Sequence, residues 1–131
     1  MLYEFRIQTG KTGFYPITDK VKEAVAKSGV KDGICVVFCP HTTAAITINE
    51  NCDPDVVHDL IVASDATFPD RRDFRHMEGN SAAHMKSSVF GASEVLIIEN
   101  GKLVLGTWQG VYFAEFDGPR TRHYYVKIIA G

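Results

Sequence analysis

Residues 76–91 bring together side chains that can bind a metal, transfer protons or hold an anion. His76, Glu78, His84 and Lys86 lie around a Gly-Asn turn in this segment. Two histidines and a carboxylate can bind a divalent metal and leave positions open for a substrate. Because histidine titrates near neutral pH, the same groups can equally act as general acid and base. We therefore predict a functional site here; a solvated loop with a helix-capping glutamate is the alternative.

Lys86 and Ser87 follow His84 near the start of a predicted helix. An ammonium group, a hydroxyl and free backbone N–H groups favour an anion such as phosphate. No Gly-x-x-x-x-Gly-Lys motif accompanies them, so a solvated lysine is the alternative.

A second polar segment, residues 41–54, carries similar chemistry. His41 follows a proline at a strand break, where side chains often face a cleft; a turn histidine that caps backbone groups is the alternative. Asn49 belongs to a polar block before a helix, which loop chemistry alone also explains. In that helix Asp55 and Asp59 stand four residues apart, and such like charges repel slightly unless a cation is near. The helix dipole also favours Asp55, so a structural role is the alternative.

The C-terminal part holds a charged cluster of Glu115, Asp117, Arg120 and Arg122. Arginine recognises phosphate through paired N–H groups, and it pairs with carboxylates in the same way. The cluster therefore predicts either phosphate recognition or a network of structural ion pairs.

Apolar periodicity and turn residues predict the elements that position these groups. Helices are expected over residues 18–28 with Thr18 as N-cap, from Asp53-Pro54 onward, and over residues 81–90 after Asn80. Strands are expected at residues 2–9, 34–38, 45–48, 94–98, 102–107, 111–116 and 123–129.

The Asn100-Gly101 pair predicts a type I′ hairpin turn. Ile97 and Leu105 lie in the flanking strands, where truncation to alanine, if they are buried, costs about 2–5 kcal/mol. Antiparallel hairpins dominate the C-terminal half, so the predicted class is α+β rather than a doubly wound sheet.

Composition limits the function. The 131 residues fit one domain, and the net charge of −2 gives no basic footprint for nucleic acid or an anionic membrane. No apolar run is long enough to span a bilayer, and we expect a cytoplasmic location. Three cysteines argue against a disulfide framework. Cys35 and Cys39 are expected to be buried small hydrophobes rather than zinc ligands.

The chain resembles the YjbQ-like family, small proteins described as secondary thiamin-phosphate synthases. The resemblance runs through most of the chain in family order. It is carried by His41-Thr42-Thr43-Ala44-Ala45, Ile48-Asn49-Glu50-Asn51-Cys52-Asp53-Pro54, His76-x-Glu78-Gly79-Asn80, Ala83-His84-x-Lys86-Ser87-Ser88, Gly106-Thr107-Trp108-Gln109-Gly110 and Glu115-Phe116-Asp117-Gly118-Pro119-Arg120.

The resemblance implies a single compact α+β domain over residues 1–131, with largely antiparallel β-sandwich character, assembled as a homotrimer. It also implies a polar pocket near the subunit boundary, with His41, Asp59, His76, Glu78 and His84 as candidates. The implied reaction joins a hydroxymethylpyrimidine diphosphate to a thiazole phosphate and expels pyrophosphate.

The resulting hypothesis is an enzyme acting on phosphorylated small molecules, with a divalent metal, Mg²⁺ or Zn²⁺, as its cofactor. The candidate catalytic residues are His41, His84 and Glu78. The candidate phosphate-binding residues are Lys86, Ser87, Asn49 and Arg120. The candidate metal ligands are His41, His76, His84 and Asp59. The alternatives are a non-catalytic metal- or metabolite-binding trimer and a metal-dependent hydrolase.

Overall fold

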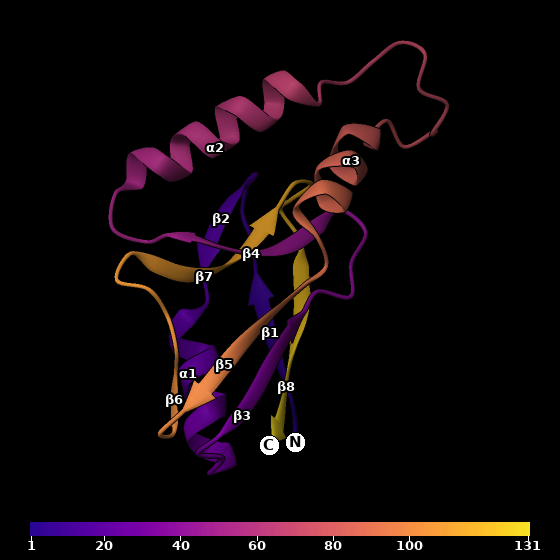
Figure 1. The fold of residues 1–131 in the computed structure, drawn as a ribbon. Helices are drawn as coiled ribbons and strands as arrows, with labels where there is room; N and C mark the ends of the chain where they lie inside the picture. Colours follow the sequence, from indigo (N-terminus) through magenta and orange to yellow (C-terminus); the bar gives the residue numbers. More distant parts are fainter.

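A computed structural model describes all 131 residues, which form eight strands and three helices (Figure 1). The predicted α+β class is confirmed. In chain order the elements are β1 (Leu2–Gln8), β2 (Gly13–Pro16), α1 (Thr18–Ser28), β3 (Gly33–Phe38), β4 (Ala44–Glu50), α2 (Pro54–Thr67), α3 (Ser81–Phe90), β5 (Ser93–Glu99), β6 (Lys102–Leu103), β7 (Gln109–Glu115) and β8 (Thr121–Ala130). None of the helices is long and apolar enough to cross a membrane.

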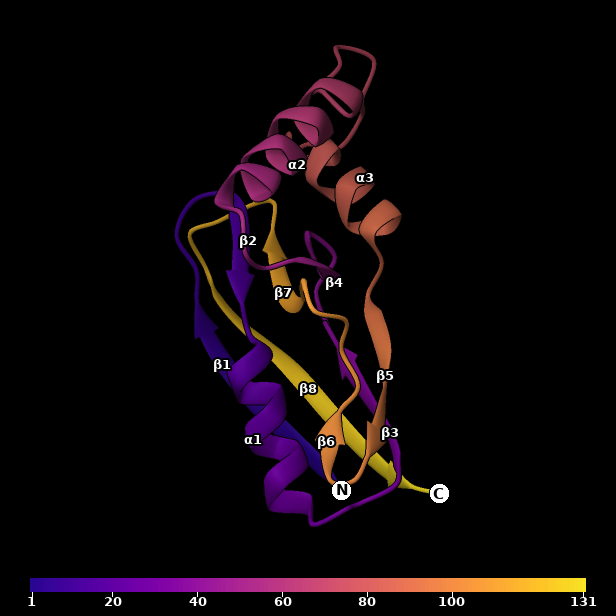
Figure 2. The same cartoon turned by 60° about the vertical axis from the view of Figure 1, so that its left-hand side comes forward.

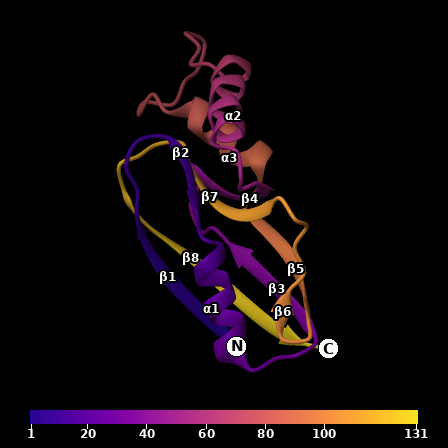
Figure 3. The same cartoon turned by 90° about the vertical axis from the view of Figure 1, so that its left-hand side faces the viewer.

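The strands form two antiparallel sheets. The larger sheet has five strands in the order β1-β8-β3-β5-β6, and the smaller has three in the order β2-β7-β4. Helix α1 contacts β6, β7 and β8, on the side of the larger sheet that faces the smaller one (Figure 2). Helices α2 and α3 lie beyond the smaller sheet, at the end of the molecule away from the two termini (Figure 3).

The three-stranded sheet is the middle layer, and its central strand β7 is buried on both faces. Val111 and Phe113 point into the main core, which α1 and the larger sheet complete. Tyr112 and Ala114, which alternate with them, point into a second core beneath α2 and α3. Alternate side chains of a strand point to opposite faces, so a strand covered on both faces has a continuous apolar sequence. Residues 111–114 of β7 are such a run.

Several local predictions are confirmed. The Asp53 carboxylate accepts a hydrogen bond from the Asp55 amide at 2.9 Å, so Asp53 caps α2 as expected. Asn100 and Gly101 both adopt positive φ angles, 52° and 75°, as a type I′ turn requires. Cys35 and Cys39 are free and buried, and burial raises the pKa of the Cys35 thiol to about 11.

Other local predictions were wrong. Thr18 is not the N-cap of α1: its hydroxyl accepts a hydrogen bond from the Val111 amide at 2.9 Å and ties the helix to β7. Asn80 occupies the N-cap of α3 but makes no capping bond. Strand β2 was not predicted, because it is only four residues long and depends on pairing with β7. Strand β6 ends at Leu103, well before the expected residue 107.

Ile97 does not meet the condition of burial on which its expected loss of stability depended. Its side chain is 58% exposed, whereas its neighbours Leu96 and Ile98 are 3% and 2% exposed. Successive strand residues point to opposite faces, so the buried set on β5 is shifted by one position. Leu105 is only partly buried and packs at the margin of the main core.

We expect Ile98→Val to lower the free energy of unfolding by about 0.5–1.5 kcal/mol, because a buried methyl group is lost and leaves a small cavity. The control Val62→Ala, at an exposed position on α2, should change it by less than about 0.5 kcal/mol. Chemical denaturation of both variants measures the two values. Equal losses would contradict the burial of Ile98 in the main core.

Candidate functional site

A cavity of about 360 Å³ opens at the end of the molecule that carries α3. Apart from Pro40, every lining residue is polar or charged. The lining residues are Pro40, His41, Thr42, Thr43, His76, Glu78, Asn80, His84, Arg120 and Arg122. Three histidines and two arginines thus face one carboxylate, Glu78, in what we call the polar cavity.

Four separate segments supply these residues. Residues 40–43 form the link between β3 and β4, and residues 76–80 lead into α3, whose first turns carry His84. Arg120 precedes β8 and Arg122 lies within it. The hydroxyl of Ser87 donates to the Ala44 carbonyl at 2.7 Å and fastens α3 to β4. The helix therefore holds its histidine at a fixed place beside the β3–β4 link.

A buried ion pair supports the floor of the polar cavity. Arg122 donates to the Glu115 carboxylate through Nε at 2.8 Å and Nη2 at 2.5 Å, and Nη2 also donates to Thr43 Oγ1 at 2.9 Å. Thr9 Oγ1 donates to Glu115 Oε1 at 2.6 Å. Burial alone would raise the pKa of Glu115, but the hydrogen bonds from Arg122, Thr9 and the Asp117 amide outweigh it and hold the pKa below its ordinary value.

A second ion pair, between Arg120 and Asp117, lies at the rim. Arg120 Nη2 donates to Asp117 Oδ2 at 2.9 Å, and Asn80 Nδ2 donates to the same oxygen at 2.8 Å. Burial acts to raise the pKa of Asp117. The two hydrogen bonds and the arginine charge lower this pKa by a larger amount, so the net shift is downward. About half of the Arg120 side chain stays exposed, so this arginine can still meet a ligand.

His41 is held by the backbone of β8. Its Nε2 accepts a hydrogen bond from the amide of His123 at 2.9 Å, and its ring lies edge-on to Phe113 with a centroid distance of 6.4 Å. Burial and the nearby charge of Arg122 lower the pKa of His41. The imidazole is therefore biased toward its neutral form.

His76 and His84 form a second pair of lining residues. Their ring centroids are 5.3 Å apart in an edge-to-face arrangement, and Glu78 Oε1 lies 4.0 Å from His76 Nε2. Neither ring makes a hydrogen bond within the chain, so the nitrogens of both are free to meet a ligand. The structure thus brings His41, His76, Glu78 and His84 to one cavity, together with Arg120.

The other four predicted site residues lie elsewhere. Asp59 is on the exposed face of α2 and pairs with His58, 3.0 Å away. Lys86 is buried and forms an ion pair with Asp65, which ties α3 to α2. Ser87 binds the Ala44 carbonyl, as described above. Asn49 is exposed on β4, where its side chain accepts a hydrogen bond from the next amide.

Three of the four candidate metal ligands, His41, His76 and His84, line the polar cavity, and the fourth, Asp59, lies outside it. No group of three histidine, cysteine, aspartate or glutamate side chains is close enough to hold a metal ion. Structural zinc needs four protein ligands and catalytic zinc three. In this structure the side chains of the polar cavity are not arranged as either kind of site.

Five lining residues were not among the predicted site residues: Pro40, Thr42, Thr43, Asn80 and Arg122. The sequence did carry a signal for Arg122. It is in phase with Tyr124, Val126 and Ile128, which all point into the core. An arginine at an inward strand position must find a buried partner, and Glu115 occupies the equivalent inward position on β7.

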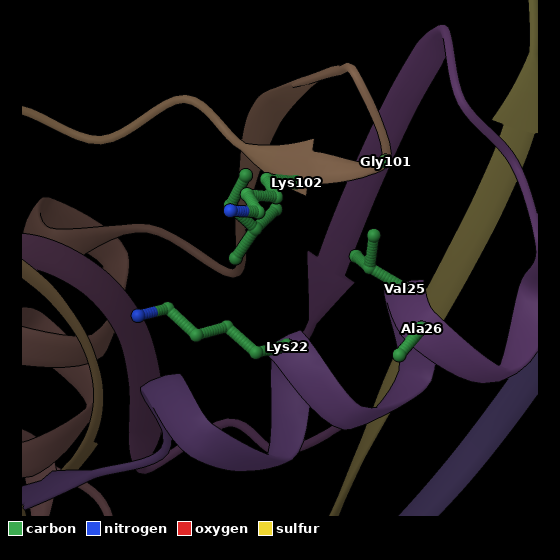
Figure 4. Close-up of a pocket in the computed structure, with 6 residues that line it drawn as sticks. Lys22, Val25, Ala26, Gly101 and Lys102 are labelled. Carbon is green, nitrogen blue, oxygen red and sulfur yellow. The ribbon is translucent and has the colours of Figure 1, made fainter.

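A larger cavity, about 460 Å³, lies between α1 and the β5–β6 hairpin (Figure 4). Lys22 and Lys102 supply its cationic groups, and Val25 and Leu103 supply apolar surface. No histidine or carboxylate lines it, so it offers no pair of groups for proton transfer. The polar cavity is the better candidate for chemistry.

The fold and the polar cavity define a small α+β protein with a histidine- and arginine-lined site. The sequence matches the UPF0047 protein YjbQ-like family over residues 3–131. The chain belongs to this family.

Relatives and solved structures agree with this assignment. The chain is 54% identical to UPF0047 protein MJ1081 of Methanocaldococcus jannaschii over 130 residues, which covers 98% of this chain and 94% of the relative. It is 52% identical to UPF0047 protein YugU of Bacillus subtilis, covering 98% and 99%. A crystal structure of a family protein from Clostridium acetobutylicum superposes with a TM-score of 0.95 at 59% identity, covering 97% and 99%. A YbjQ-like protein of unknown function from Sulfolobus solfataricus gives 0.91 at 35% identity, covering 100% and 99%.

Proposed function

We propose that the chain is an enzyme that acts on a phosphorylated small molecule bound in the polar cavity. The observation that carries the proposal is the lining: three histidines and two arginines with a single carboxylate and no aliphatic or aromatic hydrocarbon side chain except Pro40. Such a lining favours a small anion over an apolar ligand. The volume of about 360 Å³ lies within the range of small-molecule sites.

The arrangement suits the departure of a phosphate group. Arg120, half exposed at the rim, can donate to phosphate oxygens and stabilise the charge that develops on them. His84, beside His76 and Glu78, is placed to give or take a proton at the reacting atom. Arg122 is neutralised by Glu115 and contributes mainly by fixing the floor.

Thiamin-phosphate synthesis is the specific reaction we propose to test, on the strength of the sequence motifs described above. It joins hydroxymethylpyrimidine diphosphate to thiazole phosphate and releases pyrophosphate. The donor set of the chain does not make a metal site of its own, so no step here is assigned to a resident metal. We propose instead that Mg²⁺ enters bound to the diphosphate, in keeping with its preference for phosphate oxygens and water.

The test is an assay with both substrates and Mg²⁺ that measures thiamin phosphate and pyrophosphate separately. Formation of both products supports the proposed synthesis. Inorganic phosphate alone would indicate the metal-dependent hydrolase. Tight binding of the diphosphate without any product would indicate a metabolite-binding protein instead.

We also propose that the chain assembles as a homotrimer through the outer face of the five-stranded sheet. Apolar side chains cluster there in register: Ile34 lies opposite Ile97 on β5 and opposite Ile129 on β8. Val95 and Phe38 extend the patch, and all five side chains are at least 38% exposed. A contiguous apolar face of this kind is typical of an interaction surface.

Light scattering at micromolar concentration is expected to give the mass of a trimer. Ile97→Asp should reduce it to a monomer, because a carboxylate at the centre of the apolar face would be buried without a partner. Val62→Asp, on the exposed side of α2, is the matched control and should leave the mass unchanged. A monomeric wild-type protein would overturn the proposed assembly.

A further inference from the structure

The hydrogen bond to His41 fixes where its proton lies. The His123 amide donates to Nε2 at 2.9 Å, so Nε2 must offer a lone pair. In a neutral imidazole one nitrogen carries the proton and the other accepts. The proton of His41 is therefore on Nδ1.

The donor to His41 is itself immobile. His123 lies in β8, between β1 and β3, and pairs with Arg6 of β1 in the antiparallel ladder. A proton on Nε2 would face the amide N–H directly, so the ring cannot be protonated there without losing this bond or moving the strand. The tautomer is set by the main chain rather than by a side chain that could rotate away.

Only one polar atom of His41 is left for a ligand. Nδ1 has no hydrogen-bond partner within the chain, and it is not among the buried unpartnered atoms. Because Nδ1 carries the proton, it can donate but cannot accept a proton or bind a metal through a lone pair. His76 and His84 differ, since the backbone holds neither of their rings.

We infer that His41 is a neutral hydrogen-bond donor, through Nδ1–H, to an oxygen of the bound anion, and is neither the general base nor a metal ligand. This inference rests on the proposed function of the polar cavity. A phosphate oxygen that gains charge as a bond breaks binds such a donor more strongly. Proton transfer then falls to His84, beside His76 and Glu78. His41 and His84, both candidate catalytic residues in the sequence, therefore receive different roles.

The first test is nuclear magnetic resonance of ¹⁵N-labelled protein, which distinguishes the two neutral tautomers and the cation of each histidine. Between about pH 6 and 8, His41 is expected to remain the neutral Nδ1–H form. The Nε2–H tautomer or a cationic ring in this range would overturn the inference. Added Zn²⁺ should broaden or shift the signals of His76 or His84 before those of His41; a first response at His41 would also overturn it.

The second test measures the binding of pyrophosphate by calorimetry. His41→Ala is expected to weaken it by about tenfold or more, as loss of a hydrogen bond to a charged group does. His41→Asn, which keeps an N–H donor near the position of Nδ1 without a titratable ring, should retain more affinity than His41→Ala. His58→Ala, a histidine change on the exposed face of α2, is the control and should not alter binding.

The outcomes separate this inference from the proposed reaction. Unchanged affinity in His41→Ala would overturn the donor role, whatever the enzyme does. Pyrophosphate binding that depends on His41, in a protein that turns over neither substrate, would remove the proposed synthesis and leave the donor role standing.

Discussion

Replacement of Glu115 by alanine is expected to lower the free energy of unfolding by about 3–5 kcal/mol, because it strands the charge of a buried arginine. The side chain of Glu115 is fully buried and that of Arg122 is 5% exposed. Without the carboxylate, the guanidinium keeps Thr43 as its remaining partner, and the Thr9 hydroxyl keeps only the Arg120 carbonyl as acceptor. Urea denaturation measures the loss, and circular dichroism before denaturation confirms that the variant is folded.

The control for Glu115→Ala is Glu23→Ala, which removes an exposed carboxylate of α1 that pairs with Lys20 and Lys27 at 3.8 and 3.6 Å. Exposed pairs of this kind contribute at most about 1 kcal/mol. A loss in Glu115→Ala no larger than that of Glu23→Ala would show that the buried network is not a stabilising unit.

The Glu115 carboxylate also makes the free energy of unfolding depend on pH in the acid range. The pKa of Glu115 is lower in the folded chain than its ordinary value. A carboxylate with a depressed folded-state pKa contributes its stability above its unfolded-state pKa and loses it as the pH falls through the folded-state value. The difference in stability between wild type and Glu115→Ala should therefore be largest near neutral pH and shrink in acid.

His84→Ala is expected to lower turnover by about 100-fold or more, the usual effect of losing a general acid or base. This equals a loss of about 2.7 kcal/mol in transition-state stabilisation. The folded state should change little, because the His84 ring has no hydrogen-bond partner in the chain and alanine is a strong helix former. Turnover of the diphosphate and a thermal melt, taken on the same sample, measure the two effects.

His58→Ala is the matched control for His84→Ala, because it removes a histidine from a helix whose exposed face lies outside the polar cavity. Normal turnover is expected in this variant. If His84→Ala melts far below the wild type, His84 is structural. If it melts and turns over normally, His84 lies outside the reaction and the proton-transfer role assigned to it is wrong.

Local chemistry made much of the fold predictable. The Asp53 cap, the Asn100-Gly101 turn and the three helical segments depend on neighbours in the chain, so their residue types carry the information. Strand β2 and the register of β5 depend on pairing with distant strands. Ile97 and Ile98 are chemically alike, and only the position of α1 and the second sheet decides which of them is buried.

The candidate site shows the same division. Histidine-rich motifs identified His41, His76, Glu78 and His84, since core packing does not require such side chains. The sequence could not show whether Lys86 binds a ligand or is structural. A lysine beside a histidine at the start of a helix can bind phosphate or form an ion pair. Only the approach of α2, which brings Asp65 to the ammonium group, makes Lys86 structural.

The sequence alone determined the family, the α+β class and the residue types of the site, because these follow from motifs and local periodicity. The tertiary structure alone decided which charged groups neutralise one another and which meet a ligand. Glu115 and Arg122 became a buried support, Asp59 was left on an exposed helix face, and the His123 amide assigned the proton of His41 to Nδ1. Each of these outcomes depends on contacts between segments far apart in the chain. The phase of Arg122 on its strand indicated that it needs a buried partner, but only the fold decides which groups meet.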